Sequence, residues 1–223
     1  MTRLLLASAS PARLLTLRNA GIDPLVQISN VDEDAAVAEA IERFGELTPD
    51  QVALVLARAK AEDVSSRLEG DALDADLVVG CDSVLEIDGE AFGKPASAED
   101  AVTRWQRMAG STGVLHTGHW LIDVRPDNEG GTGATLGTTA STGVTFADID
   151  DDEIQSYVAT GEPLRVAGAF TVDGLGGPYI DSIDGDYHNV VGLSLPLLRQ
   201  LLSELQIPWR SLRAGAPDRV SVP

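Results

Sequence analysis

The chain has 223 residues, a length that fits one domain or at most two small lobes. With 43% hydrophobic and 23% charged residues its composition is that of a soluble globular protein, which excludes a disordered tail, a collagen-like fibre and a membrane bundle. The 16 basic and 35 acidic residues give a net charge of −19, which repels nucleic-acid backbones and anionic lipid, so we expect neither a polymeric nucleic acid nor a membrane as a partner.

The N-terminal residues predict a buried strand that runs into a helix. Residues 4–7 are apolar, Ser10 is placed to cap a helix with Pro11 at its first position, and Gly21 ends it. The apolar run breaks at Ser8, too early for a signal sequence, and no apolar stretch approaches the ~20 residues of a membrane span. We therefore expect a cytoplasmic protein.

The next segment predicts a second strand and a second helix. Residues 25–29 fit a strand, and an acidic run follows at 32–34. Residues 48–51, Thr-Pro-Asp-Gln, have the form of a capping box. Behind it the apolar side chains recur at the spacing of one helix face, at Val52, Val55, Leu56 and Ala59.

Strand patterns then follow one another closely. Residues 77–80 form a continuous apolar run typical of a strand covered on both faces. The Asp-Gly pair at 88–89 predicts a tight hairpin turn between strands at 84–87 and 90–92. A helix capped by a serine is expected over 97–110.

The second half of the chain predicts long strands and two more helices. Residues 114–124 and 143–147 fit strands, and the residues between them, 125–142, are rich in Gly and Thr and predict a loop or a ragged hairpin end. Helices are expected over 150–161, capped by an aspartate, and over 195–205, which is amphipathic.

Early alternation of strands and helices, with adjoining strands in the middle, predicts an α/β fold with a mixed twisted sheet and flanking helices. We expect a single domain over 1–207 and a loosely held C-terminal tail over 208–223. The lone Cys81 excludes an internal disulfide framework and a cysteine-only zinc site.

The start of the first helix is one candidate site. Ser8 and Ser10 precede the helix and Arg13 lies in its first turn, and the free backbone N–H groups of a helix start can hold a phosphate. An ordinary helix cap explains the same residues and, for this segment alone, is the favoured interpretation.

Acidic residues supply two further candidates. Asp82 follows the apolar strand, where α/β proteins place reactive groups, and could hold a divalent cation or accept a proton from water. A turn-forming aspartate explains it equally well. The run at 32–34, which contains Glu33, is either a metal-binding edge or a solvated charge run, and the abundance of acidic residues favours the second.

The chain contains only two lysines, Lys60 and Lys94. A lysine is ordinarily a surface residue without a special role, but their scarcity makes both positions worth following. The three histidines, at 116, 119 and 188, do not have zinc-binding spacing, so no role is assigned to them.

Seven short motifs occur in order along the chain: Leu-Ala-Ser-Ala-Ser-Pro-Ala-Arg (6–13), Val-Asp-Glu (31–33), Ala-Arg-Ala-Lys-Ala (57–61), Gly-Cys-Asp-Ser (80–83), Asp-Gly-Glu-Ala-Phe-Gly-Lys-Pro (88–95), Ala-Gly-Ala-Phe (167–170), and Ile-Asp-Gly-Asp-Tyr (183–187) with Val-Gly-Leu (191–193). Together they resemble the Maf family of nucleoside triphosphate pyrophosphatases over residues 4–202. One such motif is weak evidence, whereas seven in the family's order are strong evidence.

The resemblance implies an elongated, two-lobed fold with a central cleft, like that of the inosine triphosphate pyrophosphatases, and commonly a homodimer. It also implies hydrolysis of a nucleoside triphosphate, including non-standard ones, to the monophosphate and pyrophosphate, with Mg²⁺ or Mn²⁺ as the divalent metal cofactor. The alternative is a nucleotide-binding regulator of septum formation with incidental hydrolysis. A phosphosugar or nucleotide transferase is a weaker third hypothesis.

Carried onto this chain, the family's catalytic aspartate is Asp82, and Glu33 and Asp82 are the expected metal ligands. The residues expected on the phosphate side are Ser8, Ser10, Arg13, Lys60 and Lys94. The dTTP- and UTP-hydrolysing branch has Arg, Thr and Gln at its specificity positions, where this chain has Ala12, Ser83 and Asp173. We therefore do not extend the base preference of that branch to this chain.

Overall fold

The computed structural model describes residues 2–68 and 73–213, and within them the strands form one seven-stranded sheet of order β2-β1-β3-β5-β6-β7, with β4 paired to β3. The strands are β1 (Leu4–Leu6), β2 (Leu25–Val26), β3 (Leu77–Ile87), β4 (Glu90–Phe92), β5 (Thr112–Asp123), β6 (Thr135–Phe146) and β7 (Ile180–Asp184). β1 pairs in parallel with β2 and β3, whereas the pairings among the later strands are antiparallel. The predicted α/β fold with a mixed sheet is therefore confirmed.

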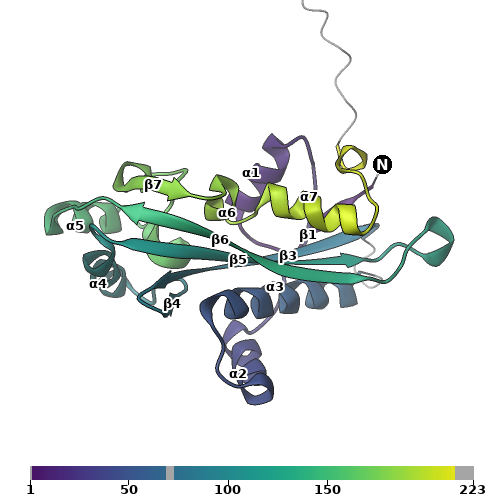
Figure 1. Ribbon diagram of the computed structural model, residues 1–223, viewed down its shortest axis with the longest axis horizontal. Helices are drawn as coiled ribbons and strands as arrows, with labels where there is room; N and C mark the ends of the chain where they lie inside the picture. Colours follow the sequence, from purple (N-terminus) through teal and green to yellow (C-terminus); the bar gives the residue numbers. More distant parts are fainter. Residues whose placement is uncertain (1, 69–72, 214–223) are drawn as a thin grey trace, which may run out of the picture.

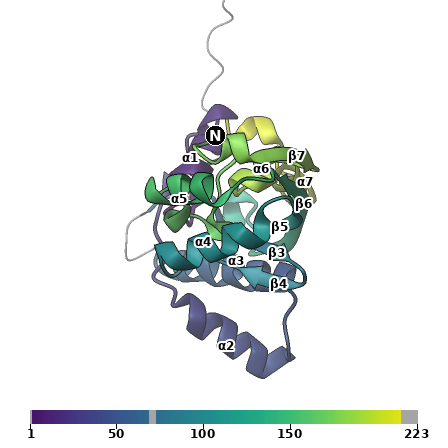
Figure 2. The same ribbon diagram turned by 90° about the vertical axis from the view of Figure 1, so that its left-hand side faces the viewer.

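Helices cover both faces of the elongated sheet (Figure 1). They are α1 (Pro11–Asn19), α2 (Glu33–Phe44), α3 (Pro49–Ser66), α4 (Ala98–Met108), α5 (Asp151–Ala159), α6 (Tyr187–Val191) and α7 (Leu195–Glu204). Figures 1 and 2 show α3 along one face with α2 outside it, and α1, α6 and α7 on the opposite face. α4 and α5 lie together near one end of the long strands.

Two glycines allow α3 to lie directly on the sheet. A Cβ at Gly80 of β3 would come 2.2 Å from the carbonyl oxygen of Ala57, and one at Gly118 of β5 would come 2.3 Å from that of Ala53. A larger residue at either position would therefore push the helix away from the sheet. The close contact places Lys60, on the same helix, beside β3.

The core is divided into clusters along the long strands. β3 contributes Val79 and Cys81 to one cluster, which includes side chains of β1, α1 and α7. Further along, β3 contributes Leu85 and Ile87 to a second cluster that is built with α4 and α5. Asp82 lies on the part of β3 between the two clusters.

β3 is one strand where the sequence pattern predicts two. The predicted strands at 77–80 and 84–87 join because β5 pairs with β3 along almost its whole length. Asp82 therefore lies within the strand, not after its end. β1 ends at Leu6, which is opposite Val79, and β4 pairs with β3 only from Leu85, so one side of residues 80–84 is not paired with a strand.

The acidic run at 32–34 begins a helix that is not among the elements predicted from the sequence. Asp32 caps α2 by accepting the backbone N–H of Ala35 at 3.0 Å. Glu33 and Asp34 occupy the first turn, where negative charge is favourable because of the helix dipole.

The prediction of a loop or ragged hairpin end over 125–142 is also wrong in part. Residues 135–142 belong to β6 and pair with β5 in regular antiparallel register. Their threonines suit a sheet surface, and the neighbouring strand, more than the local pattern, determines the structure here.

The predicted helix caps are confirmed at Ser10, Ser97 and Asp150, whose side chains each accept a backbone N–H of the first turn. The capping box at 48–51 is present at the start of α3. The turn at 88–89 joins β3 to β4 as predicted. Local sequence therefore determines where most of the helices begin.

The first part of the predicted tail is held against the body. Leu212 is buried, and the carbonyl of Ser211 accepts the backbone N–H of Thr2 at 2.8 Å. The remainder, 214–223, lies outside the described residues, and the assignment of 1–207 to a single domain stays a prediction. Within the described part of the chain, no helix has both the length and the apolar character needed to cross a bilayer.

Candidate active site

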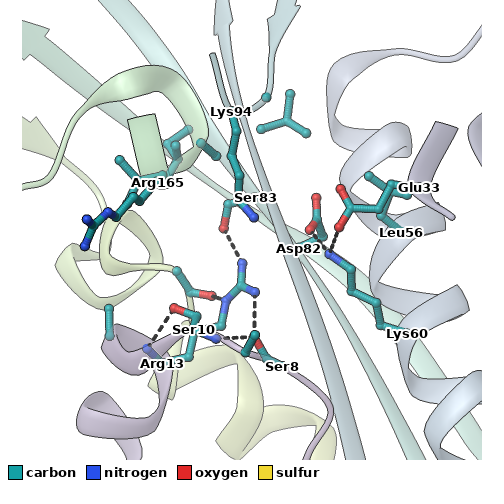
Figure 3. Close-up of a pocket in the computed structure, with 18 of the residues that line it drawn as sticks. Ser8, Ser10, Arg13, Glu33, Leu56, Lys60, Asp82, Ser83, Lys94 and Arg165 are labelled. Carbon is teal, nitrogen blue, oxygen red and sulfur yellow. Dashed lines mark hydrogen bonds and ion pairs between the residues drawn. The ribbon is translucent and has the colours of Figure 1, made fainter. Parts of the chain in front are cut away.

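A cavity of about 700 Å³ opens beside the part of β3 that continues past β1 (Figure 3). The start of α1, the first turn of α2, α3, the segment after β4 and the residues before α7 all contribute to its lining. The lining includes every site residue predicted from the sequence: Ser8, Ser10, Ala12, Arg13, Glu33, Lys60, Asp82, Ser83, Lys94 and Asp173. Residues that are far apart in the chain are thus brought together in one place.

Lys60 lies between the two carboxylates of the site. Its Nζ is 2.5 Å from Oδ1 of Asp82 and 2.7 Å from Oε1 of Glu33. The side chains of Lys60 and Asp82 are only 11% and 13% exposed, whereas that of Glu33 is 48% exposed. Because the three residues come from α3, β3 and α2, these ion pairs connect three elements at one point (Figure 3).

The two carboxylates differ in how easily they ionise. Burial raises the pKa of Asp82, because loss of water disfavours a carboxylate, although the charges of Lys60 and Arg13 oppose the shift. Partial burial also opposes ionisation of Glu33, but the hydrogen bond and charge of Lys60, with Lys94 and Arg13, outweigh it and lower the pKa. A pair whose pKa values move apart suits one carboxylate that stays ionised and another that accepts a proton.

Arg13 is buried in the first turn of α1, and its partners are all uncharged. Its Nε donates to the carbonyl of Gly192 (2.7 Å), and its Nη1 donates to Oγ of Ser8 (3.1 Å) and to the carbonyl of Cys81 (2.8 Å). Its Nη2 donates to Oγ of Ser83 at 3.0 Å. Four of its five N–H groups are therefore used within the protein, and one on Nη2 is left without a described partner.

The serines at the start of α1 shape the cavity beside Arg13. Ser10 caps the helix, and its Oγ accepts the backbone N–H of Arg13 at 3.4 Å. Oγ of Ser8 accepts the backbone N–H of Ser10 at 3.2 Å as well as the Arg13 guanidinium. Among the described residues the hydroxyl proton of Ser8 has no acceptor, so it is available to an anionic ligand in the cavity.

Two more cationic side chains lie at the exposed part of the cavity. Lys94 follows β4 and extends into the cavity toward Ser83 (Figure 3). It makes no ion pair or hydrogen bond with a residue that the structure describes. Arg165, which sequence reasoning missed, also lines the cavity, from the 3₁₀ turn Pro163–Arg165. Neither its position nor its neighbours match a pattern that could have identified it.

Part of the cavity is apolar, which the sequence did not reveal. Its walls include Val31, Val37, Val52, Leu56, Phe170 and Val172. A cavity with charged groups in one part and apolar side chains in another suits a ligand that combines an anionic group with a flat or apolar one.

The donor set fits a divalent metal ion that is bound together with a polyphosphate. The second oxygens of Glu33 and Asp82 accept no hydrogen bond from a described residue, and carboxylate oxygens are the ligands that Mg²⁺ prefers. Within the described residues no group of three or more His, Cys, Asp or Glu side chains could hold a metal ion. Mg²⁺ commonly uses one or two carboxylates and completes its shell with water and phosphate oxygens, which these residues allow.

Comparison with known proteins gives consistent matches. The sequence matches the family described as Maf-like protein over residues 3–205. A protein of Salinispora tropica named nucleoside triphosphate pyrophosphatase is 54% identical over 210 residues, covering 94% of this chain and 87% of that protein. One of Leifsonia xyli with the same name is 54% identical over 215 residues and covers 96% of this chain and 98% of its own. Among solved structures, that of the Staphylococcus aureus Ham1 protein covers 95% of this chain and 94% of its own, with 16% identity and a TM-score of 0.39.

Proposed function

Because the chain belongs to the Maf-like protein family, we propose that it hydrolyses a nucleoside triphosphate to the nucleoside monophosphate and pyrophosphate. Relatives that are 54% identical and match nearly its whole length carry the name of that activity. The observation that carries the proposal is the placement of three cationic and two acidic side chains around one cavity: Arg13, Lys60, Lys94, Glu33 and Asp82.

The negative net charge of the protein explains why the cationic side chains that bind a triphosphate must be close together. A triphosphate carries about four negative charges, and the protein has a net charge of −19, so long-range attraction does not favour binding. The positive potential has to be local. Arg13 supplies a buried charge that no described carboxylate neutralises, and Lys94 supplies an exposed ammonium without a described partner.

In the proposed reaction Asp82 positions a water molecule and accepts its proton as the water oxygen attacks the α-phosphorus and pyrophosphate leaves. Burial raises the pKa of Asp82, which makes its carboxylate a stronger base than an exposed aspartate. Lys60, at 2.5 Å, keeps Asp82 ionised before the transfer. In this proposal Asp82 is the base, and Lys60 keeps it in the form that can accept a proton.

The remaining cations stabilise the charge that builds on the leaving group. Arg13 and Lys94 would hold phosphate oxygens, and the N–H on Nη2 of Arg13 that has no described partner allows a single direct hydrogen bond. The hydroxyl of Ser8 and the start of α1 offer further donors on the same side of the cavity.

A divalent ion, Mg²⁺ or Mn²⁺, would be held by Glu33 and Asp82 with phosphate oxygens of the substrate. Such an ion supplies neutralisation of phosphate charge and polarisation of the reacting phosphoryl group. We propose it as the cofactor because the two carboxylates converge within one cavity and keep oxygens without described partners.

The base-recognition positions differ from those of the dTTP- and UTP-hydrolysing branch, and the structure adds a reason to separate them. Ala12 and Asp173 line the cavity and are open to a ligand. Ser83 instead directs its hydroxyl into contacts with Arg13 and Thr117. We therefore propose that Asp173, not Ser83, contacts the base in this chain.

The decisive experiment measures pyrophosphate release from the common nucleoside triphosphates and from inosine triphosphate, with and without Mg²⁺ or Mn²⁺. We expect metal-dependent formation of equal amounts of monophosphate and pyrophosphate from at least one of them. Binding without turnover would contradict the proposal and favour a nucleotide-binding regulator. A requirement for an acceptor substrate would favour a transferase.

Asp82→Asn links the activity to this site. The variant keeps the shape of the side chain but removes its basicity, and we expect the rate to fall by about 10²–10⁴. An Asp82→Asn protein that is folded and releases pyrophosphate at the normal rate would show that the residue is assigned wrongly. The homodimer and the cytoplasmic location stay predictions, and light scattering of the purified protein tests the first.

A further inference from the structure

The hydroxyl of Thr117, on β5, lies behind the cavity and contacts Ser83. Its Oγ1 is 2.9 Å from Oγ of Ser83 and 3.0 Å from the carbonyl oxygen of Asn189. Thr117 and Asn189 are both completely buried. Solvent therefore cannot replace a hydrogen bond that is lost between these groups.

Counting protons fixes the direction of each hydrogen bond. The carbonyl of Asn189 can only accept, so it takes the single hydroxyl proton of Thr117. The contact between Ser83 and Thr117 must then use the proton of Ser83, so Ser83 is the donor. Oγ of Ser83 in turn accepts Nη2 of Arg13 at 3.0 Å. Donation runs in one direction, from Arg13 through Ser83 and Thr117 to Asn189.

We propose that Thr117 is a positioning residue, which orients the Ser83 hydroxyl so that Ser83 accepts the hydrogen bond of Arg13 and holds its guanidinium for the reaction. The inference rests on the proposed function, because Arg13 is assigned there to the phosphates. Without the acceptor on Thr117, the Ser83 hydroxyl would turn to another partner, and one side of the guanidinium would lose its fixed position. Hydrogen bonds that point in one direction also polarise and strengthen one another. Loss of the Thr117 hydroxyl therefore also weakens the hydrogen bond from Arg13 to Ser83.

The surroundings hold Thr117 itself in place. His119 accepts the backbone N–H of Ser194 at Nε2 (2.8 Å), so its proton is on Nδ1, which donates to the carbonyl of Thr117 (2.9 Å). Burial lowers the pKa of His119 to about 4, and the ring is therefore neutral near pH 7. His119 thus holds the backbone of Thr117 in place without adding a positive charge near Arg13.

Two substitutions at one position test the inference. Thr117→Val replaces the hydroxyl by a methyl group of similar shape, and Thr117→Ser keeps the hydroxyl. We expect Thr117→Val to lower kcat by about 10- to 100-fold, the effect of losing a hydrogen bond that supports a charged group, with little change in KM. Thr117→Ser should retain most of the activity. Equal activity of Thr117→Val and the unsubstituted protein would overturn the inference.

A double-mutant cycle separates positioning from a general loss of stability. In a Ser83→Ala protein the hydroxyl through which Thr117 acts is absent, so Thr117→Val should cause no further loss of kcat. If the two effects multiply, Thr117 does not act through Ser83. The thermal midpoint of each variant is measured, and the kinetics are compared at a temperature at which all of them are folded.

Thr145→Val is the control. Thr145 lies in the same sheet and pairs its hydroxyl with that of Thr112 at 3.1 Å, but it makes no described hydrogen bond with a group in the chain from Arg13 to Asn189. The Thr145→Val protein should keep its kcat, and a loss as large as that of Thr117→Val would overturn the inference. Absence of pyrophosphate release by the unsubstituted protein would instead refute the proposed function, so the two failures are distinguishable.

Discussion

The ammonium of Lys60 lies 2.5 Å from Oδ1 of Asp82, and the two side chains are 11% and 13% exposed. A carboxylate that is this buried is costly to ionise without a cation beside it. Lys60 therefore stabilises the fold as well as contributing to the site. Its removal should lower the free energy of unfolding, which is measured without substrate.

We predict that Lys60→Met lowers the free energy of unfolding at pH 7 by about 3 kcal/mol, the usual cost of leaving one partner of a buried ion pair uncompensated. Urea denaturation of the purified variant measures the loss. Lys60→Met/Asp82→Asn is the control, because it removes the orphaned charge as well, and it should recover most of the lost stability. A double variant that is less stable than Lys60→Met would show that the ion pair is not the cause.

The position of Lys60 also predicts how a divalent ion binds. Its ammonium already lies against both Glu33 and Asp82, at 2.7 Å and 2.5 Å, and cancels one of their two charges, so the protein alone offers little attraction for a second cation. Calorimetry should detect no binding of Mn²⁺ at millimolar concentration without nucleotide, and clear binding with a non-hydrolysable triphosphate. In Lys60→Met the two carboxylates are free, and Mn²⁺ should bind without nucleotide. Tight binding of Mn²⁺ to the unsubstituted protein alone would contradict this prediction.

Lys94→Ala should weaken substrate binding and turnover without changing the stability of the fold. Lys94 has no ion pair or hydrogen bond with a described residue, so its removal should leave the thermal midpoint unchanged. Loss of a charged contact to phosphate should raise KM by about tenfold and also lower kcat. Arg18→Ala is the matched control because it changes the net charge equally at an exposed ion pair with Asp23, away from the cavity. If both variants behave alike, net charge and not a specific contact explains the effect.

The sequence predicted those parts of the fold that depend on local chemistry. Ser10, Ser97 and Asp150 are caps because an oxygen on a short side chain reaches the backbone N–H groups of the turn that follows, whatever the remainder of the chain does. The same independence explains the hairpin turn at 88–89. The site residues were predicted through the resemblance, and the structure brings all ten of them to one cavity.

Features that depend on distant partners were missed. α2 is an exception, because Val37, Ala40, Ile41 and Phe44 have the spacing of one helix face and the helix could have been predicted from them. Residues 135–142 are a strand because β5 lies beside them. The contacts among Arg13, Ser83 and Thr117 arise from the register of β3 with β5, in which Ser83 lies opposite Thr117. No spacing within one segment contains that information.

The last prediction concerns the end of β5. Asp123 is buried, and it accepts hydrogen bonds from Nε and Nη2 of Arg125 at 2.8 and 2.9 Å and from the backbone N–H and hydroxyl of Thr132 at 2.9 and 2.8 Å. These contacts, led by the hydrogen bonds of Arg125, hold the pKa of Asp123 far below its ordinary value. The lowered pKa stabilises the folded state above the ordinary pKa of about 3.9, and this contribution is lost as the pH falls toward the folded-state value. Asp123→Asn should therefore lower the free energy of unfolding by about 2–3 kcal/mol at pH 7.

The pH dependence of the stability distinguishes an effect of the Asp123 charge from an effect of side-chain packing. The difference in free energy of unfolding between the unsubstituted protein and Asp123→Asn should shrink as the pH is lowered below about 4, because the carboxylate then loses its charge advantage. Urea denaturation of both proteins between neutral and acidic pH measures the difference. A difference that stays constant over that range would mean that the shape of the side chain, and not its charge, holds Arg125 and Thr132 in place.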